Sequence, residues 1–428
     1  MAERRDIPIL LAILLFALLP RVWFLSYPAG PVFDEIHYPP AAADDLAGLP
    51  DSNPVHPPLG KLVMAVGMEA WWGLDRYVLH THSDAVAWRL GSLVLGLATI
   101  ALTYVFALAL FHNRRTATLS ALLLSLDLLH IVQSRMAMLD MYEAFWILLG
   151  LYGTWRYIEG DTRWLWWASI AFGCGVATKW STMFAMVGAL AAVTLLKSPR
   201  QACKALGVGL LVTVAVYILS YLPMARAESI EIAREDATPA LAGRLQAPVG
   251  APNAVRVLYR IAAFHRLMWE FRHDPSQFWH PDLSPWWQWP LCIRPVWYLA
   301  MPKPATVQCI IALPTVWTWW PFLLVLALVL GAGRPRSPDA RARLFCVLGY
   351  VPQVVLWALN PGFLFYMLPC LPLMYLLLGD QACRLGRGFA AGYLALCAVG
   401  TALYWPLLVA WPVPHTYCQS LMLGRWWM

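Results

Sequence analysis

The sequence predicts a polytopic α-helical membrane protein, from its composition and from the length of its apolar runs. The chain has 428 residues, of which 60% are hydrophobic and 13% charged, and its mean hydropathy is +0.58. A soluble domain carries about 25% charged residues. Apolar runs of about 17 to 25 residues recur, each long enough to cross a hydrocarbon core of about 30 Å as a helix. A membrane β-barrel would instead show short alternating segments, and the sequence has none.

The apolar runs predict about eleven spans when they are read with a window of roughly twenty residues. The first run contains Pro20 and Arg21, lacks a small-residue cleavage site and is followed by more spans, so we interpret it as a span and not as a signal peptide. The expected spans lie near residues 7–25, 94–111, 117–132, 142–157, 164–177, 183–196, 206–222, 314–330, 344–359, 364–378 and 389–410.

The charges predict an orientation. Lys and Arg gather in short linkers between the spans, at Arg4-Arg5, Arg114-Arg115, Lys197 to Lys204, Arg334 to Arg343, and Arg384 with Arg387. Cytoplasmic loops carry this excess of basic residues. We therefore expect a cytoplasmic N-terminus in a multi-pass protein of the inner (plasma) membrane. The two large polar stretches, residues 26–85 and 225–292, then lie outside, and 1–428 is a single integral domain.

Metal and disulfide chemistry are not indicated by the cysteines. The 9 Cys are scattered, mostly inside apolar runs, and form no CxxC pair. Neither a structural zinc site nor a disulfide framework is expected. Walker A, Rossmann, G-x-S-x-G and HExxH motifs do not occur either. Nucleotide-sugar or ATP chemistry in a soluble domain is therefore not supported, and any sugar donor would have to arrive through the membrane.

An acidic pair, Asp34-Glu35, follows directly on the first span. Carboxylates at a bilayer surface can deprotonate a hydroxyl or bind a cation, and lipid-facing packing does not need them. The alternative is a solvated loop pair. Arg21 inside the first apolar run and Arg89 at the start of the second favour a polar cavity, because a guanidinium inside a membrane usually has a functional partner.

The block from His56 to Lys61 contains two prolines and a glycine before an apolar segment, residues 62–72. Prolines fix an extended backbone and Gly60 permits a helix to begin. We expect an amphipathic helix lying on the membrane. The alternative for His56 and Lys61 is plain interfacial snorkelling.

Polar residues also crowd the region between the third and fourth spans, where Asp127, Arg135 and Asp140 interrupt apolar sequence, and Lys179 lies further along at the same face. Arg135 and Lys179 together could hold a phosphate, because Arg offers a fork to its oxygens and Lys a point charge. The alternative is a buried ion pair of Arg135 with Asp140 or Asp127.

Several of these blocks recur in a fixed order with further ones. They are Phe33-Asp34-Glu35-Ile36-His37, Val55 to Lys61, Gln133-Ser134-Arg135 with Leu139-Asp140, Ala177-Thr178-Lys179-Trp180, the Trp-Pro-rich segment from His280 to Tyr298, and Phe363 to Pro369. In this order they resemble the protein O-mannosyltransferases, the dolichyl- or polyprenyl-phosphate-mannose-dependent enzymes of the GT-C class.

The resemblance implies a GT-C glycosyltransferase fold and an inverting reaction. Mannose would pass from a polyprenyl phosphate to Ser or Thr hydroxyls of secreted or membrane proteins, at the extracytoplasmic face. The lipid-linked sugar is a substrate, so no cofactor is implied. No metal is expected, although Asp34 and Glu35 could hold a cation together with Asp44 or Asp45.

The resemblance also implies roles for individual residues. Asp34 would act as the base, with Glu35 as its orienting partner. Donor phosphate binding would fall to the cations Arg21, Arg89, Arg135 and Lys179. Acceptor binding or loop organisation would fall to His56, Lys61, Asp140, Trp286 and Trp289.

Two departures from the family pattern stand out. The second outer loop is far too short for the β-trefoil MIR domain of eukaryotic members, so the chain resembles the bacterial type. The late block begins Asn360-Pro361-Gly362, where a basic residue is expected.

Two other functions stay open: a sister lipid-phosphate-sugar transferase acting on lipid A or a glycan, and a transporter, which should have broken helices near the midplane.

Overall fold

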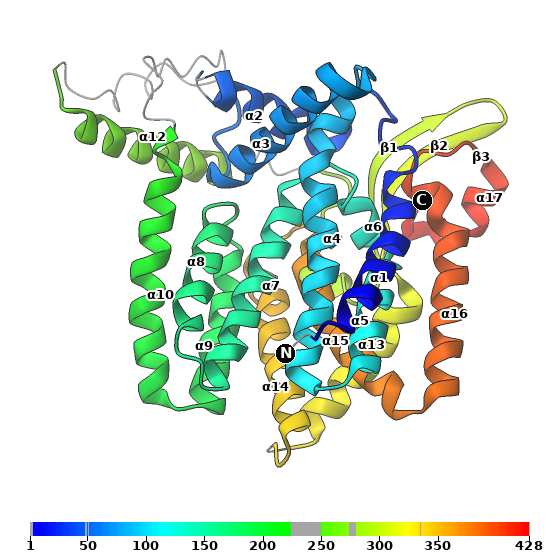
Figure 1. Cartoon of the computed structure of the whole chain (residues 1–428). Helices are drawn as coiled ribbons and strands as arrows, with labels where there is room; N and C mark the ends of the chain where they lie inside the picture. Colours follow the sequence, from blue (N-terminus) through cyan, green and yellow to red (C-terminus); the bar gives the residue numbers. More distant parts are fainter. Residues whose placement is uncertain are drawn as a thin grey trace.

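The computed structural model describes residues 3–47, 49, 51–223, 250–273, 280–333 and 335–427. Most of its helices run side by side as one bundle, and α2, α3, α12 and a small sheet gather at one end of that bundle (Figure 1). Much of the second outer loop, residues 225–292, and the basic residue Arg334 therefore fall outside the described residues.

The elements, in chain order, have the following bounds. The first half comprises α1 Asp6–Val22, η1 Phe33–Ile36, α2 Tyr38–Ala47, α3 Leu59–Leu74, η2 Asp75–Leu79, α4 Asp84–Phe111, α5 Arg114–Ser125, α6 Leu128–Gln133, α7 Leu139–Ile158, α8 Trp164–Val176, α9 Thr182–Leu196 and α10 Pro199–Ser220. The second half comprises α12 Asn253–His273, η5 Trp286–Gln288, β1 Val296–Pro302, β2 Thr306–Ala312, α13 Val316–Gly331, α14 Pro338–Val355, η6 Leu356–Leu359, η7 Leu364–Cys370, α15 Leu371–Arg384, α16 Arg387–Tyr404, η8 Trp405–Leu408, β3 Val413–Pro414, α17 His415–Ser420 and η9 Arg425–Trp427.

Each expected span coincides with helical structure, and the third is divided between α5 and α6. Among the described residues, five helices are long and apolar enough to cross a membrane by length and composition. They are Asp84–Phe111, Pro199–Ser220, Pro338–Leu359, Leu364–Arg384 and Arg387–Leu408. The helical membrane fold is confirmed, whereas the count of about eleven spans stays a prediction.

The two ends of the bundle carry different connections. The α4–α5, α9–α10, α13–α14 and α15–α16 connections, which hold the basic linkers, lie at the end opposite α2, α3 and the sheet (Figure 1). Two of these linkers end in Ser-Pro: Ser198 and Ser337 accept a backbone N–H at the start of α10 and α14, and the prolines occupy the first turn. Basic linkers and acidic first loop are thus segregated, as the charge pattern predicted.

The small sheet was not expected from the sequence. Its order is β1-β2-β3, antiparallel throughout, with Val296 opposite Ala312 and Thr306 opposite Pro414. Strand β2 is buried over nearly its whole length, and its residues Cys309 to Ala312 form a short apolar run without alternation. Such a continuous apolar run cannot be told from a buried helix by periodicity.

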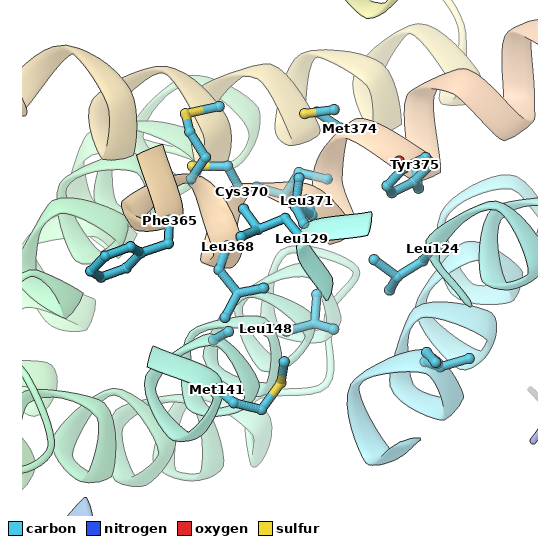
Figure 2. Packing of buried hydrophobic residues seen from close by; sticks show 14 of the residues in the cluster. Leu124, Leu129, Met141, Leu148, Phe365, Leu368, Cys370, Leu371, Met374 and Tyr375 are labelled. Atoms are coloured by element: carbon cyan, nitrogen blue, oxygen red, sulfur yellow. The ribbon is translucent and has the colours of Figure 1, made fainter. Parts of the chain in front are cut away.

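Buried side chains from α5, α6, α7, η7 and α15 meet in the middle of the bundle (Figure 2). Those labelled there are Leu124, Leu129, Met141, Leu148, Phe365, Leu368, Cys370, Leu371, Met374 and Tyr375. Asp127, which caps α6, reaches this core and accepts hydrogen bonds from Tyr375 Oη at 2.6 Å and Trp319 Nε1 at 3.0 Å. This packing fixes the first turn of α7, where Asp140 lies.

Candidate active site

The two acids of the first loop lie in η1 and have different environments. Glu35 is fully buried, and Arg89 grips its carboxylate with Nε and Nη2, both at 2.8 Å. The backbone N–H groups of Val32 and Ala137 donate to the same carboxylate, at 3.1 and 2.9 Å. Glu35 therefore ties the first loop to α4 and to the turn before α7 by a bidentate, charge-assisted contact.

Asp34 is only partly buried. Its Oδ2 accepts a hydrogen bond from Tyr38 Oη at 3.3 Å. Burial raises the pKa of Asp34 to about 6, the Asp140 carboxylate adds to the rise, and the Lys179 ammonium opposes it. A carboxyl with this pKa is mostly ionised at neutral pH and is a stronger base than an ordinary Asp.

Lys179 and Asp140 form a buried ion pair beside Asp34. Lys179 Nζ lies 2.9 Å from Asp140 Oδ1 and 4.8 Å from the centre of the Tyr366 ring. Asp140 Oδ2 is buried and has no hydrogen-bond partner among the described residues. One turn along α7, Glu143 accepts hydrogen bonds from Ser181 Oγ at 2.6 Å and Thr182 Oγ1 at 3.2 Å. Two carboxylates of α7 thus flank the turn that carries Lys179.

A close approach of α3 positions this turn. The backbone N–H of Leu59 donates a hydrogen bond to the Ala177 carbonyl at 3.0 Å. A Cβ on Gly60 would come within 2.8 Å of both Leu139 and Thr178. Only glycine permits this spacing without a shift of its neighbours, so the His56–Lys61 block brings the Lys179 turn and the start of α7 together.

Arg135 does not form the ion pair that was the alternative to phosphate binding. Its guanidinium donates to the carbonyls of Arg21 at 2.5 Å, Trp23 at 2.6 Å and Phe24 at 3.0 Å, and it is only 3% exposed. Carbonyls at a helix C-terminus lack partners inside the helix and attract cations. Arg135 therefore caps the end of α1.

Arg21 and Arg89 are likewise engaged inside the protein. Arg21 donates to the carbonyls of Ala17 at 2.8 Å and Ser125 at 3.1 Å, and its Nη2 lies 2.9 Å from His130 Nδ1. Besides Glu35, Arg89 donates a hydrogen bond to the carbonyl of Leu25 at 2.8 Å. Arg21 thus joins α1 to α5 and α6, and Arg89 holds the first loop. Of the four expected cations, Lys179 is the one that lies next to Asp34.

The remaining expected residues organise the loops around this site. Lys61 is fully buried and pairs with Asp51, so interfacial snorkelling of Lys61 is wrong. The ring of His56 lies 5.9 Å from that of Tyr38. Trp289 is buried and donates to Ser284 Oγ at 3.0 Å, whereas Trp286 is half-buried against the core.

Two aromatic rings lie against Phe33 of η1, from His280 in the second outer loop and Tyr298 in β1. Phe33 stacks on Tyr298 with ring centres 4.6 Å apart and contacts His280 at 5.7 Å. Backbone bonds between Ser284 and Gly362 join this loop to the late block. Gly362 therefore takes part in a backbone bridge between the second outer loop and the late block.

Sequence reasoning did not single out several groups that line this region. They are Tyr38, Glu143, His280, Tyr298 and Tyr366. Four of them follow or lie inside the motif blocks, which was the signal available; Glu143 could have been found as one helical turn from Asp140.

An apolar cavity of about 460 Å³ lies between α8, α9 and α10. Its walls are almost entirely aliphatic and aromatic, and they include Trp180, Tyr217 and His265. Trp180 Nε1 donates to Tyr217 Oη at 3.0 Å. Trp180 is the residue after Lys179 in the chain, so the cavity wall includes the chain neighbour of the charged site.

No group of three or more metal-ligating side chains occurs within the part of the chain that the structure describes. The alternative of a cation held by Asp34 and Glu35 loses a ligand, because both Glu35 oxygens are engaged by Arg89.

Known proteins resemble this chain in sequence and fold. A polyprenol-phosphate-mannose–protein mannosyltransferase of Mycobacterium tuberculosis is 26% identical, over 92% of this chain and 86% of that protein. The Saccharomyces cerevisiae protein O-mannosyltransferase Pmt1-Pmt2 complex, bound to the sugar donor, superposes with a TM-score of 0.78 at 13% identity, covering 100% of this chain and 93% of that one. ArnT from Cupriavidus metallidurans, bound to undecaprenyl phosphate, superposes with a TM-score of 0.61 at 15% identity, covering 93% and 64%.

These likenesses establish the GT-C membrane glycosyltransferase fold. The model of the family described as dolichyl-phosphate-mannose-protein mannosyltransferase matches residues 11–227, just over half of the chain. The matched segment contains the acidic loop, the α3 block and the Lys179 turn. The chain therefore belongs to the dolichyl-phosphate-mannose-protein mannosyltransferase family.

Proposed function

We propose that this chain transfers mannose from a polyprenyl-phosphate donor to Ser or Thr hydroxyls of protein acceptors, with Asp34 as the general base. The observation that carries the assignment is the grouping of a partly exposed carboxyl of raised pKa with the Lys179–Asp140 pair. A base and a cation on one site suit a displacement in which a hydroxyl attacks and a phosphate leaves.

The chemistry follows from these positions. The acceptor oxygen attacks the anomeric carbon while its proton passes to Asp34, and the bond from that carbon to the lipid phosphate breaks. Single displacement inverts the anomeric configuration. Lys179 stabilises the charge that grows on the departing phosphate, as a preorganised cation does in a site with little water. The proton then leaves Asp34 to solvent.

The other expected residues support this chemistry indirectly. Glu35 and Arg89 fix η1, and Arg135 fixes the end of α1 through backbone carbonyls. We assign these three as positioning residues. His56 and the Trp286–Trp289 segment border the acceptor side, because His56 contacts Tyr38 and a ring of the second loop lies against η1.

We assign the apolar cavity between α8, α9 and α10 to the polyprenyl chain of the donor. The walls offer aliphatic and aromatic surface, against which an isoprenoid tail can pack in place of the surrounding lipid. With Trp180 in the wall, the phosphate would lie beside Lys179.

The test is transfer by the purified protein from polyprenyl-phosphate mannose to a Ser/Thr peptide. We expect transfer by the wild type and a loss of about 10²-fold or more in Asp34→Asn. Excess EDTA should leave the rate unchanged, whereas activity lost to EDTA and restored by Mg²⁺ or Mn²⁺ would contradict a metal-free mechanism. Transfer to lipid A or a glycan, with none to peptide, would instead support the sister enzyme.

A further inference from the structure

Two cysteines that are 109 positions apart meet beside the small sheet. Cys309 lies in β2 and Cys418 in α17, and both are buried. Their thiols interact directly, and this interaction raises the pKa of Cys309 and lowers that of Cys418. A buried thiol usually has a raised pKa, so the Cys418 sulfur is unusually prone to form a thiolate.

The surrounding backbone holds this contact in place. Strand β3 pairs with β2 immediately before α17 begins. Ala410 donates its backbone N–H to the Cys309 carbonyl at 3.1 Å. Gln308 Nε2 donates to the Ala410 carbonyl at 3.1 Å. These bonds hold the C-terminal segment on β2, and α17, which carries Cys418, follows β3 directly.

The pair lies outside the helices that could cross a membrane. The sheet and α17 share the end of the bundle with α2 and α3, away from the basic linkers (Figure 1). Under the proposed orientation this end faces the extracytoplasmic space, where disulfides form and persist.

We infer that Cys309 and Cys418 form a disulfide in the mature protein. The oxidant is an oxidised dithiol protein, of the class that exchanges disulfides with newly exported chains. The Cys418 thiolate attacks its disulfide to give a mixed disulfide, and the Cys309 sulfur then attacks Cys418 Sγ. The new S–S bond forms as the oxidant leaves with two thiols, so electrons and protons balance.

A Cys309–Cys418 disulfide would stabilise the packing of the C-terminal segment on the stretch that leads from α1 to Asp34. Gln308, next to Cys309, also donates to Tyr27 Oη at 3.0 Å, and Trp411 packs on Phe24 with ring centres 5.0 Å apart. Both contacts fall on the segment between α1 and Asp34. Linking Cys309 to Cys418 fixes the C-terminal segment against that stretch.

The experiment counts thiols in the full-length protein. Membranes from cells are quenched in acid, denatured and labelled with a mass-tagged maleimide, with and without prior reduction. We expect two more labelled thiols after reduction. Cys309→Ser and Cys418→Ser should each abolish this difference, and Cys292→Ser, a buried cysteine at another position, should keep it.

A wild type that labels equally with and without reduction would overturn the inference. So would a difference that persists in Cys309→Ser. The inference rests on the proposed orientation, so intact cells are also treated with a membrane-impermeant maleimide. Labelling of the exposed Cys203 in α10 would trace the failure to an inverted topology. Mannosyl transfer is assayed on the same preparations and reports separately on the proposed function.

Discussion

At the scale of single residues, the adjacent acids Asp34 and Glu35 illustrate how environment divides their roles. Glu35 accepts hydrogen bonds from a guanidinium and two backbone N–H groups, so its contacts hold the first loop in place. Within the described ranges, the Asp34 carboxyl accepts one side-chain hydrogen bond, from Tyr38 at 3.3 Å, and Asp140 and Lys179 lie near it. A carboxylate with free capacity and a raised pKa can accept a proton, whereas a saturated one cannot do so without breaking its contacts.

The first prediction separates these roles. Asp34→Asn should reduce turnover by about 10²-fold or more without lowering the melting temperature. Glu35→Gln should reduce turnover and also lower the melting temperature, because breaking a buried ion pair by removing one partner costs about 3–5 kcal/mol. Turnover and thermal unfolding in detergent are measured on both. Full activity in both variants would reject the assignment of the pair.

The sign of the stability effect at Asp34 follows from its pKa. The folded-state pKa of about 6 exceeds the ordinary value of about 3.9. The favourable contribution therefore exists below the ordinary value and is lost as pH rises through about 6. At neutral pH the ionised carboxylate destabilises the fold, and a neutral amide removes that effect.

The second prediction concerns pH. The pH profile of turnover should have an ascending limb with its midpoint near pH 6, because only ionised Asp34 accepts the acceptor proton. Asp140→Asn should move this limb to lower pH, since it removes a negative charge that raises the Asp34 pKa and frees Lys179 to lower it further. The pH profile of turnover is measured for both proteins. A limb that stays in place in Asp140→Asn would contradict the coupling.

The third prediction contrasts two cations. Lys179→Ala should weaken donor binding and slow turnover, because it removes the cation beside Asp34. Arg135→Ala should instead lower the melting temperature and leave the donor affinity of the folded fraction unchanged, since its partners are carbonyls of α1. Binding of donor and thermal unfolding are measured together. Donor affinity lost in Arg135→Ala at unchanged stability would restore direct phosphate binding by Arg135.

At the scale of elements, the helices of the bundle and the helical α3 could be predicted because they are local. Apolar run length and the Pro-Pro-Leu-Gly pattern report on neighbouring residues only. The partners of Arg135 lie more than a hundred positions away, and β2 pairs with β3 across a similar separation. No periodicity within one segment encodes such contacts, so the arginine roles and the sheet required the structure.

The candidate site shows the same division. Asp34, Lys179 and Asp140 could be chosen from the sequence because charge in an apolar setting is itself unusual. Tyr298 and Tyr366 are ordinary aromatic residues until the fold sets them beside Phe33 and Lys179. Their approach depends on how the second loop and η7 pack on η1.

The fourth prediction tests the cavity between α8, α9 and α10. Gly209 lines it, and a Cβ there meets no atom within 4 Å. Gly209→Phe should fill part of the cavity, raise the KM for a long-chain donor and leave the rate at saturation nearly unchanged. Gly207 on the same helix is equally open but does not line the cavity, so Gly207→Phe is the matched control.

A short-chain donor sharpens this test. A truncated polyprenyl phosphate leaves the far part of the cavity empty, so its KM should respond less to Gly209→Phe. Equal effects of Gly209→Phe and Gly207→Phe on the long-chain donor would show that the cavity does not receive the tail.

At the scale of the whole molecule, charge is distributed so that one end of the bundle is basic and the other holds the acidic loop, α3 and the sheet (Figure 1). A lipid-linked donor and a protein substrate must meet at one membrane surface. The cavity that we assign to the apolar tail is lined by Trp180, the chain neighbour of Lys179. The arrangement lets a donor stay in the bilayer while its phosphate reaches Lys179.

The fifth prediction follows from this polarity. Basic linkers stay on the cytoplasmic side during insertion, so the Asp34 end should face outward. Ile36 is next to the acidic pair and 55% exposed, whereas Cys203 is exposed in a basic linker segment. In intact cells a membrane-impermeant maleimide should label Ile36→Cys and spare Cys203. After the cells are opened both should react. Labelling of Cys203 in intact cells, with Ile36→Cys protected, would invert the topology and set the catalytic loop in the cytoplasm.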